Sequence, residues 1–375
     1  MSDRQTWPFY NPPLVPPIVQ TSVFQFASIA QLQAVADGET PGHIYTRWGN
    51  PNTDLVQNAL ADLEGAQQGW VFGTGMAAIT AAMLSLCRPG DHIVAVGTLY
   101  GGTHMLFKEQ LSQFGVETTF VTQDITAIQS ALQPNTKVLF GETISNPKME
   151  LLDLEPLARL ANENDLFFLV DNTFASPTLC RPLEWGVHGV MHSTTKYLNG
   201  HGDAMGGALV GEAAWIENVR AWALQLGALL DPFAAWLLQR SLQTLPLRMA
   251  AHSSNALRVA DFLEAHPKVQ TVYYPALTQP QLAAKYLPDG SSGMISFVVK
   301  GDPDSVVQGF RQIVLAPSLA DTATTVSHPV STSHRALTET ERQQQGVPYE
   351  MIRLSVGIEP VETITADLAA GLDCL

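Results

Sequence analysis

Residues 166–171, with the sequence Leu-Phe-Phe-Leu-Val-Asp, constrain the fold of this chain more than any other segment. Successive side chains of a β-strand point to opposite faces of the sheet, so a continuous apolar run needs burial on both faces. A sheet that is buried on both faces is covered by helices, and its strands are mostly parallel. The segment therefore predicts an α/β fold built around a mostly parallel central sheet.

Strand and helix patterns alternate along much of the chain, as a parallel sheet with helical crossovers requires. The predicted strands are residues 92–96, 116–121, 137–142 and 166–171. The predicted helices that precede or separate them are residues 54–63, 75–86, 103–114, 125–132 and 154–164. Two longer helical patterns cover residues 213–226 and 232–241.

These patterns divide the chain into three predicted parts. Residues 1–44 are rich in Pro, Gln and Ser, and we expect an N-terminal arm with little regular structure. Residues 45–244 hold the alternating pattern and are predicted to form a large domain. Residues 245–375 are predicted to form a smaller C-terminal α/β domain, with a strand near 294–300 and a loop-rich stretch from 317 to 341.

Composition and charge argue against several classes of function. The formal net charge is −15 and the basic residues form no run, so a nucleic-acid partner is not expected. No apolar stretch approaches the roughly 20 residues that span a bilayer, and the N-terminus lacks the apolar core of a signal peptide. Three separated cysteines, Cys87, Cys180 and Cys374, fit a reducing compartment. We expect a soluble, cytoplasmic protein without a membrane partner.

Residues 190–203 carry the strongest chemical signal. Lys196 ends a hydroxyl-rich run that includes Ser193 and Thr195, and two glycines follow it closely. A lysine can hold an aldehyde cofactor as a Schiff base and later carry protons, while hydroxyls can donate hydrogen bonds to a phosphate. These residues favour a site for pyridoxal phosphate (PLP). From this segment alone, a surface lysine after a buried strand explains Lys196 about equally well.

The end of strand 166–171 and the start of helix 75–86 could complete such a site. Asp171 could pair with a protonated ring nitrogen, and a turn or N-cap aspartate is the ordinary alternative. Residues 73–78, Gly-Thr-Gly-Met-Ala-Ala, open a predicted helix whose first N–H groups suit a phosphate. They also match a dinucleotide-binding pattern, but Asp91 lies at the wrong end of the next strand to serve as the required acid.

Two long polar side chains extend this set. Tyr100 follows strand 92–96, where its ring could stack on a planar cofactor and its hydroxyl could move a proton; a core tyrosine is the alternative. Arg353 interrupts an apolar strand pattern, and a buried arginine needs a partner. A substrate carboxylate and an internal Asp or Glu fit that need almost equally well. His188 and His192 lie on a strand pattern without a glutamate between them, so no metal site is expected.

Taken together, these segments resemble the Cys/Met-metabolism family of PLP enzymes, the trans-sulfuration enzymes. The resemblance spans nearly the whole chain, and three stretches carry most of it: residues 193–203, residues 45–51 (Tyr-Thr-Arg-Trp-Gly-Asn-Pro) and residues 353–359 (Arg-Leu-Ser-Val-Gly-Ile-Glu). It implies the fold type I of PLP-dependent transferases, which is aspartate-aminotransferase-like. It also implies a homotetramer made of two catalytic dimers.

The same resemblance implies roles for individual residues. Lys196, Tyr100 and Asp171 would be catalytic, and Tyr100 would also stack on the ring. Ser318 and Arg353 would hold the carboxylate of a small amino-acid substrate. The PLP itself would be held by Tyr45 and Arg47 from the neighbouring subunit and, from the same subunit, by Gly75, Met76, Tyr100, Asn146, Asp171, Ser193, Thr195 and Lys196.

The implied reaction is a γ- (or β-) elimination on a sulfur-containing amino acid such as methionine, cystathionine or homocysteine. The alternative is γ-replacement on an O-acylhomoserine, as in cystathionine γ-synthase or an O-acylhomoserine sulfhydrylase. A PLP-binding protein without turnover is a minor alternative. Pro317 stands where cystathionine enzymes frequently have a glutamate for the distal amino group, so we expect little preference for cystathionine unless Asp321 takes over that role.

Overall fold

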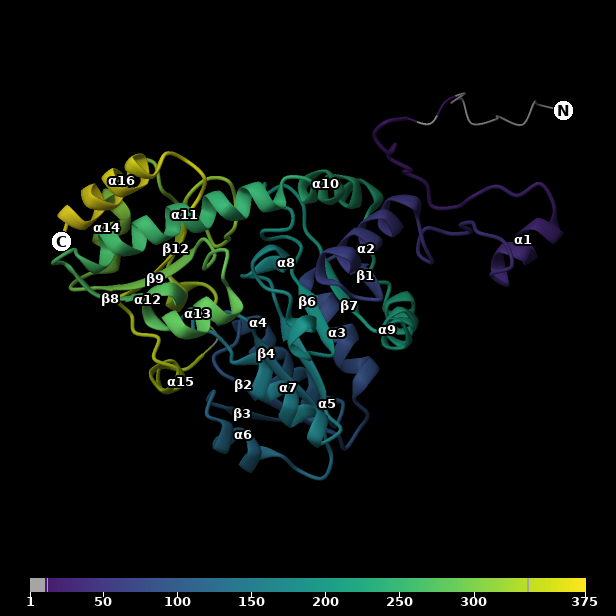
Figure 1. Ribbon diagram of the computed structural model, residues 1–375, viewed down its shortest axis with the longest axis horizontal. Coiled ribbons are helices and arrows are strands. Elements are labelled where there is room, and N and C mark those ends of the chain that lie inside the picture. Colours follow the sequence, from purple (N-terminus) through teal and green to yellow (C-terminus); the bar gives the residue numbers. More distant parts are fainter. Residues whose placement is uncertain (1–10, 12, 336) are drawn as a thin grey trace.

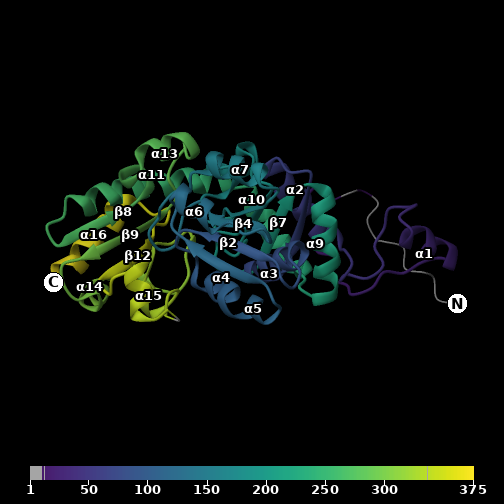
Figure 2. The same ribbon diagram turned by 90° about the horizontal axis from the view of Figure 1, so that it is seen from below.

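A computed structural model describes residues 11, 13–335 and 337–375 of the chain. Figure 1 shows a body with two sheets, each with helices packed on it, and an N-terminal segment that extends away from that body. Seen from below in Figure 2, helix α1 (Ile29–Ala36) and helix α16 (Val361–Asp373) lie at opposite ends of the molecule.

The larger sheet holds the strands that the sequence pattern predicted, together with strands that it did not. Strands β2 to β6 are mutually parallel, whereas β7 runs antiparallel to both β1 and β6. The order across the sheet is β1-β7-β6-β5-β4-β2-β3. The strands are β1 (Gln68–Phe72), β2 (His92–Val96), β3 (Glu117–Val121), β4 (Thr136–Glu142), β5 (Phe167–Asp171), β6 (Gly189–His192) and β7 (Gly207–Gly211).

Both faces of this sheet are buried, as the apolar run at 166–171 predicted. Phe168 and Val170 of β5 pack into one core, with helices of one layer, and Leu169 packs into a second core on the opposite face. The first layer contains α2 (Pro51–Glu64), α6 (Ile125–Ala131), α7 (Leu154–Glu163), α8 (Ser176–Leu179) and α10 (Pro232–Leu242). The second contains α3 (Gly75–Leu86) and α9 (Ala213–Leu226).

Some elements differ from the expected pattern. The helix predicted at 103–114 is divided into α4 (Gly101–Met105), a π-helical turn η1 (Leu106–Gln110) and α5 (Leu111–Gln113). Strands β1 and β7 were not predicted, because glycines interrupt their apolar patterns. Gly207 allows the start of β7 to lie close to the backbone that precedes α3, since a Cβ at this position would lie 2.2 Å from the carbonyl oxygen of Thr74. A short 3₁₀ segment, η2 (Pro182–Trp185), precedes β6.

The smaller sheet lies in the C-terminal part of the chain and is mostly antiparallel. Its order is β10-β11-β12-β9-β8, with only β10 and β11 parallel. The strands are β8 (Val269–Tyr273), β9 (Met294–Val299), β10 (Val314–Leu315), β11 (Thr325–Ser327) and β12 (Met351–Ser355). The surrounding helices are α11 (Leu245–Glu264), α12 (Pro275–Thr278), α13 (Pro280–Tyr286), α14 (Pro303–Gly309), η3 (Pro329–Ser331), α15 (Glu339–Gln344) and α16.

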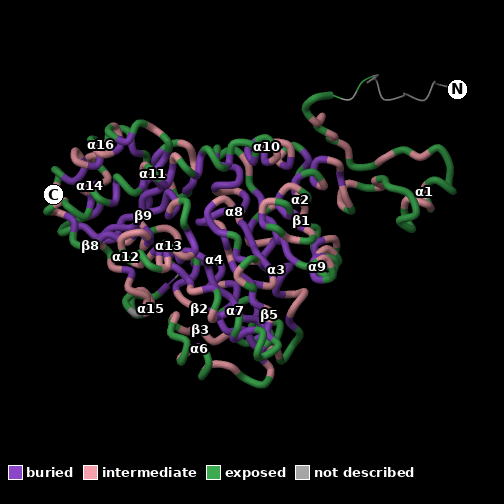
Figure 3. The backbone as a smooth tube through the Cα atoms, viewed as in Figure 1, coloured by how far each residue is buried: buried purple, intermediate pink, exposed green. Residues whose placement is uncertain are grey.

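The three-part organisation stays a proposal, which this arrangement supports. Strands β8 to β12 all lie beyond residue 245, and α11 begins at Leu245. In the described part of the predicted arm, exposed segments surround α1, a short helix that the sequence pattern did not predict (Figure 3). Residues 1–10 and 12 of that arm lie outside the described residues. None of the described helices combines the length and the apolar character that crossing a membrane requires.

A buried polar network joins α2 to the carboxyl ends of β5 and β6. A carboxylate oxygen of Glu64 lies 2.6 Å from Nε2 of His192 and accepts a hydrogen bond from Asn172 at 3.0 Å. All three side chains are almost completely buried. Asn172 also donates to the carbonyl of Cys180 and accepts from the hydroxyl of Thr143. Because Asn172 directly follows Asp171, the network holds the loop after Asp171 in a fixed position.

Replacing Glu64 with leucine should strongly destabilise the fold. His192 and Asn172 would lose the buried acceptor that they share, and each buried donor left without a partner costs ~1–3 kcal/mol. Thermal unfolding of purified protein measures the effect. Glu217→Ala is the matched control, since it removes an acid from the exposed Glu217–Arg220 pair and should cost about 1 kcal/mol at most. Equal shifts for the two variants would contradict a stabilising role of the network.

Candidate active site

A cavity of about 650 Å³ lies at the carboxyl ends of the central strands of the large sheet. Residues of the C-terminal part, including Arg353 of β12 and the loop residues 317, 319, 331–333 and 335, close its other side. Ligands of parallel α/β sheets bind at this end of the strands. Among the predicted site residues, the cavity is lined by Gly75, Met76, Tyr100, Asn146, Asp171, Ser193, Thr195, Lys196 and Arg353.

Three predicted site residues do not line this cavity. Ser318 nevertheless reaches it, because the Lys196 Nζ donates a hydrogen bond to its hydroxyl at 3.3 Å. Tyr45 and Arg47 belong to the N-terminal segment, and the Arg47 guanidinium donates to the carbonyl of Leu224 on α9 at 2.9 Å. Tyr45 is 40% exposed. The single chain therefore leaves Tyr45 and Arg47 outside its own cavity.

One end of the cavity suits an anion. Helix α3 begins at Gly75, so its first N–H groups have no partners within the helix. The hydroxyl of Thr74 accepts from the N–H of Ala77, which leaves the N–H groups of Gly75 and Met76 for a ligand. A Cβ at Gly75 would lie 2.9 Å from Cβ of Ser193, so only glycine lets Ser193 approach this closely. The first N–H groups of α3 and the hydroxyl of Ser193 thus lie together at one end of the cavity, where both can donate hydrogen bonds to an anion.

The hydroxyl residues beside Lys196 are held by the backbone. The Thr195 hydroxyl donates to the carbonyl of Gly206 and accepts from its N–H, at 3.2 and 3.0 Å. The N–H of Ser193 donates to the hydroxyl of Thr173 at 2.8 Å. Ser193 and Thr195 therefore stay in place next to the start of α3.

Asp171 ends β5 with its carboxylate toward the cavity. One oxygen accepts a hydrogen bond from the N–H of Thr173 at 2.9 Å, so the turn geometry that the sequence left open is also present. Burial raises the pKa of Asp171, and hydrogen bonds from Thr173 partly oppose that rise. A cationic group in the cavity would relieve the cost of this buried negative charge.

Lys196 lies between the anion-binding end and the C-terminal loops. Its side chain is half-buried, and burial together with the nearby Arg353 guanidinium lowers the pKa of Lys196 to about 8. A lysine with this pKa is partly neutral near pH 7, so its amine can act as a nucleophile or accept a proton. A surface lysine would show neither feature, and that alternative is wrong.

Arg353 brings a buried cation into the same cavity. Ile352 and Leu354 point into the core of the smaller sheet, so Arg353 projects from the opposite face of β12. Its side chain is buried, and one guanidinium nitrogen donates to the Asn146 carbonyl oxygen at 2.9 Å, while Nε has no partner. Within residues 13–335 and 337–375, no acidic side chain forms an ion pair with Arg353. The internal Asp or Glu that the sequence left open is therefore not its partner.

Tyr100 stands at the start of α4 and faces the cavity. Its side chain is 41% exposed, so it is not a core tyrosine. A Cβ at Gly102 would lie 2.5 Å from Cε1 of this ring and 3.2 Å from Sδ of Met76. Glycine at 102 therefore gives the Tyr100 ring the room to lie over the first turn of α4.

The sequence reasoning missed Glu142, which ends β4 beside Asp171. Its buried carboxylate accepts hydrogen bonds from the N–H groups of Tyr100 at 2.6 Å and Asn146 at 3.2 Å. Burial and the neighbouring Asp171 carboxylate raise the pKa of Glu142 well above its ordinary value. The available signal was the same as for Asp171, an acid at the carboxyl end of a predicted buried strand.

Arg335 was missed as well, because nothing in the sequence marks an arginine in a loop-rich stretch as part of a site. The structure places it, exposed, at the rim of the cavity together with Ser331, Thr332 and Ser333. His334 of the same loop is fully buried, and burial lowers its pKa to about 4, aided by the charge of Arg353. Pro317 lines the cavity and Asp321 does not.

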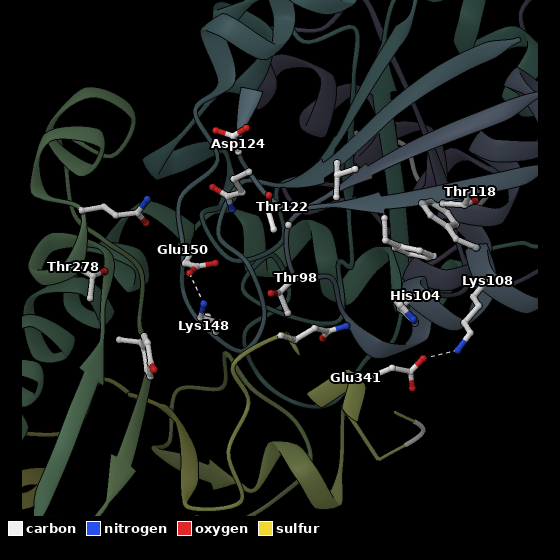
Figure 4. A pocket seen from close by; sticks show the side chains of 18 of the residues that line it. Thr98, His104, Lys108, Thr118, Thr122, Asp124, Lys148, Glu150, Thr278 and Glu341 are labelled. Atoms are coloured by element: carbon white, nitrogen blue, oxygen red, sulfur yellow. Dashed lines mark hydrogen bonds and ion pairs between the residues drawn. The ribbon is translucent and has the colours of Figure 1, made fainter. Parts of the chain in front are cut away.

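A second cavity of about 1150 Å³ lies along β3, between η1 and the C-terminal part of the chain (Figure 4). Two ion pairs cross or border it, Lys108–Glu341 and Lys148–Glu150, each at 2.6 Å. Both lysines that line it are thus paired with acids, and Glu117 and Asp124 add two further carboxylates. Although it is the larger cavity, it contains neither a reactive lysine nor an unpaired buried cation, so the smaller one is the candidate active site.

The smaller cavity has the chemistry that PLP requires. An anion-binding helix start lies at one end for the phosphate, and a buried carboxylate lies at another for the ring nitrogen. A lysine of lowered pKa stands beside them for the aldehyde. The residues present therefore fit this cofactor.

Comparisons with known proteins agree with this fit. The family profile described as Cys/Met metabolism PLP-dependent enzyme matches residues 10–373. An L-methionine gamma-lyase from Fusobacterium nucleatum subsp. nucleatum is 42% identical over 96% of this chain and 93% of its own. An O-succinylhomoserine sulfhydrylase from Pseudomonas aeruginosa is 38% identical over 95% of this chain and 90% of its own.

A solved structure gives the same result for the fold. A protein from Campylobacter jejuni subsp. jejuni, which carries N'-pyridoxyl-lysine-5'-monophosphate, superimposes with a TM-score of 0.91. It is 32% identical to this chain, and the match covers 96% of this chain and 95% of that protein. The expected PLP-dependent fold is confirmed, and the chain belongs to the Cys/Met-metabolism family of PLP-dependent enzymes.

Proposed function

We propose that this enzyme catalyses a γ- (or β-) elimination on a sulfur-containing amino acid such as methionine, cystathionine or homocysteine. The observation that carries the proposal is Arg353, a buried guanidinium without an acidic partner, close enough to Lys196 to lower its pKa. An amino-acid substrate whose carboxylate binds Arg353 presents its amino group and α-carbon toward Lys196. Ser318, which contacts Lys196, would add a hydroxyl to that carboxylate site.

We propose the same PLP-binding residues that the sequence indicated. The phosphate would be held by the N–H groups of Gly75 and Met76 and by the Ser193 hydroxyl, and also by the Thr195 hydroxyl when its proton turns from the carbonyl of Gly206 to the phosphate. Asp171 would hold the ring nitrogen. Asn146 would donate to the phenolic oxygen through its amide nitrogen, since its carbonyl oxygen already accepts from Arg353. When bound, PLP supplies an electron sink for negative charge that develops beside the amino-bearing carbon.

The protein supplies proton transfer and orientation. Lys196, with a pKa of about 8, can accept the α-proton and return a proton later. Tyr100 would stack on the cofactor ring and donate a proton to the departing γ-substituent. Glu142 fixes the backbone of both Tyr100 and Asn146 and so positions these two side chains.

The second candidate is γ-replacement on an O-acylhomoserine, which shares every early proton transfer with elimination. The outer part of the cavity favours it, because Arg335 is the charged residue there and Pro317 replaces an acid that a distal ammonium could use. A PLP-binding protein without turnover is disfavoured, since Lys196, Asp171, Tyr100 and Arg353 all face one cavity.

We further propose a homotetramer built from two catalytic dimers. The support is the position of Tyr45 and Arg47, which lie outside the cavity of their own chain in the stretch just before α2, where Arg47 donates to Leu224 of α9. In a dimer this segment would deliver both side chains to the phosphate in the partner's site. The cytoplasmic location that the three separated cysteines suggested stays a prediction.

A substrate panel tests the proposed reaction. Purified enzyme should be yellow, and borohydride should fix the cofactor on Lys196. It should release a keto acid and ammonia from at least one of methionine, cystathionine, homocysteine or an O-acylhomoserine, and added thiol should reveal any replacement. Release of keto acid from no member of the panel would overturn the lyase proposal, and thiol products alone would select the second candidate.

The pH dependence of cofactor uptake tests the pairing of Lys196 with Arg353. Uptake of PLP by cofactor-free enzyme needs the neutral amine, so its rate should rise with pH through about 8. Arg353→Met removes a positive charge that disfavours the ammonium form, so the midpoint should move to higher pH. Absorbance of bound cofactor measures the rate, with Arg159→Met as a remote, exposed control. A midpoint that stays in place or moves down would contradict this electrostatic contact.

Subunit mixing tests the proposed contribution of Arg47 to the partner's site. Arg47→Ala should weaken PLP binding by ~2–5 kcal/mol if a buried charge pair with the phosphate is lost. Mixing Arg47→Ala with inactive Lys196→Ala subunits should restore up to roughly a quarter of the activity, because half of random dimers are mixed and each has one intact site. Complete lack of recovery, despite demonstrated subunit exchange, would show that Arg47 does not serve the partner.

A further inference from the structure

The rim of the active-site cavity carries a cation that the proposed reaction has not used. Arg335 is exposed and lines the cavity, whereas Arg353 is buried within it. In the described part of the chain, its guanidinium forms no hydrogen bond or ion pair with another side chain, and only its backbone N–H donates, to the carbonyl of Thr332. The cavity thus has a cation at its buried end and a second one where it opens.

The loop that holds Arg335 is fixed to the catalytic part of the site. The N–H of His334 donates to the carbonyl of Pro329 at 2.9 Å, and the buried His334 ring contacts the Ser333 hydroxyl. Ser333 rests on the first turn of α4, because a Cβ at Gly101 would lie 1.9 Å from its carbonyl oxygen. That turn begins directly after Tyr100, so the backbone beside Arg335 has a defined position relative to the reacting groups.

The charged residues that line the cavity are unevenly distributed between its two sides. The acidic side chains that line the cavity, Glu142 and Asp171, end neighbouring strands of the large sheet. The C-terminal loops contribute Pro317, hydroxyl residues and Arg335, but no acid. A guanidinium binds a carboxylate or phosphate through two parallel hydrogen bonds. The rim therefore attracts an anionic group and offers no partner to an ammonium.

We infer that Arg335 selects substrates whose γ-substituent ends in an anion, and that the preferred class is a dicarboxylic O-acyl ester of homoserine such as O-succinyl-L-homoserine. This inference rests on the second candidate function, γ-replacement on an O-acylhomoserine, in which Arg353 also holds the α-carboxylate. A substrate with anions at both ends then spans the two cations. O-Phospho-L-homoserine shares the distal anion, but its short ester keeps that charge near the γ-carbon and away from an exposed rim residue.

Arg335→Met, compared with the wild type on three esters, tests the selection. Loss of a hydrogen-bonded charge should lower kcat/KM for O-succinyl-L-homoserine relative to O-acetyl-L-homoserine by about 10-fold or more. The change should lie mainly in KM, since the tail contact is the same before and during reaction. Arg335→Lys should lie between the two, and Arg159→Met, an exposed arginine on α7, should leave the ratio unaltered. A loss confined to O-phospho-L-homoserine would replace the dicarboxylic class with a phosphate ester.

The wild type gives a test that does not depend on how a variant folds. An exposed ion pair is screened by salt, so KM for the succinyl ester should rise with ionic strength while KM for the acetyl ester changes less. Equal losses for both esters in Arg335→Met, or a wild type that prefers the acetyl ester or methionine, would overturn the inference. These outcomes leave both candidate reactions intact, because those reactions are judged by whether any substrate of the panel yields a keto acid or a thiol product.

Discussion

The parallel strands β4, β5 and β6 end at one edge of the large sheet, and the position of every reacting group follows from that shared edge. Burial on both faces imposes the parallel arrangement, since only helical crossovers can cover both sides. Glu142 and Asp171 are in register at the ends of β4 and β5. Burial raises the pKa of both carboxyl groups, and the Asp171 carboxylate further raises the pKa of Glu142, so a cationic ring nitrogen near Asp171 would stabilise the pair.

The smaller sheet completes the site through a single outward-facing residue. Apolar neighbours of Arg353 pack into the C-terminal core, which forces the guanidinium to the opposite face and into the cavity. There it lowers the pKa of Lys196 and binds Asn146. The residue that we propose for binding the substrate carboxylate thus also lowers the pKa of the reactive amine. Ala320, two residues after Ser318, has a positive φ of 71°, which costs energy for a residue with a Cβ, so this wall of the site holds local backbone strain.

Much of the fold could be predicted, because periodicity reports burial directly. The run at 166–171 predicted a two-sided sheet, and the helices at 75–86, 154–164 and 213–226 lie within a residue or so of α3, α7 and α9. Strands β1 and β7 were not predicted, because glycines shorten the apolar runs from which a strand is recognised. In the structure, Gly207 is needed because β7 lies against the backbone that precedes α3. The division of helix 103–114 by a π-helical turn also leaves no signal in apolar spacing.

The sequence by itself determined the cofactor chemistry, because a lysine, hydroxyls, a strand-end acid and a helix start are local features whose spacing is readable. Only the tertiary structure decided three further matters: that Arg353 has no acidic partner, that Glu142 holds Tyr100 and Asn146, and that Arg335 reaches the rim. Each depends on which side chains from distant segments meet, such as 146 with 353 or 101 with 333. Such contacts form where segments that are distant in the sequence meet at the carboxyl ends of the large sheet's strands, and no local pattern records them.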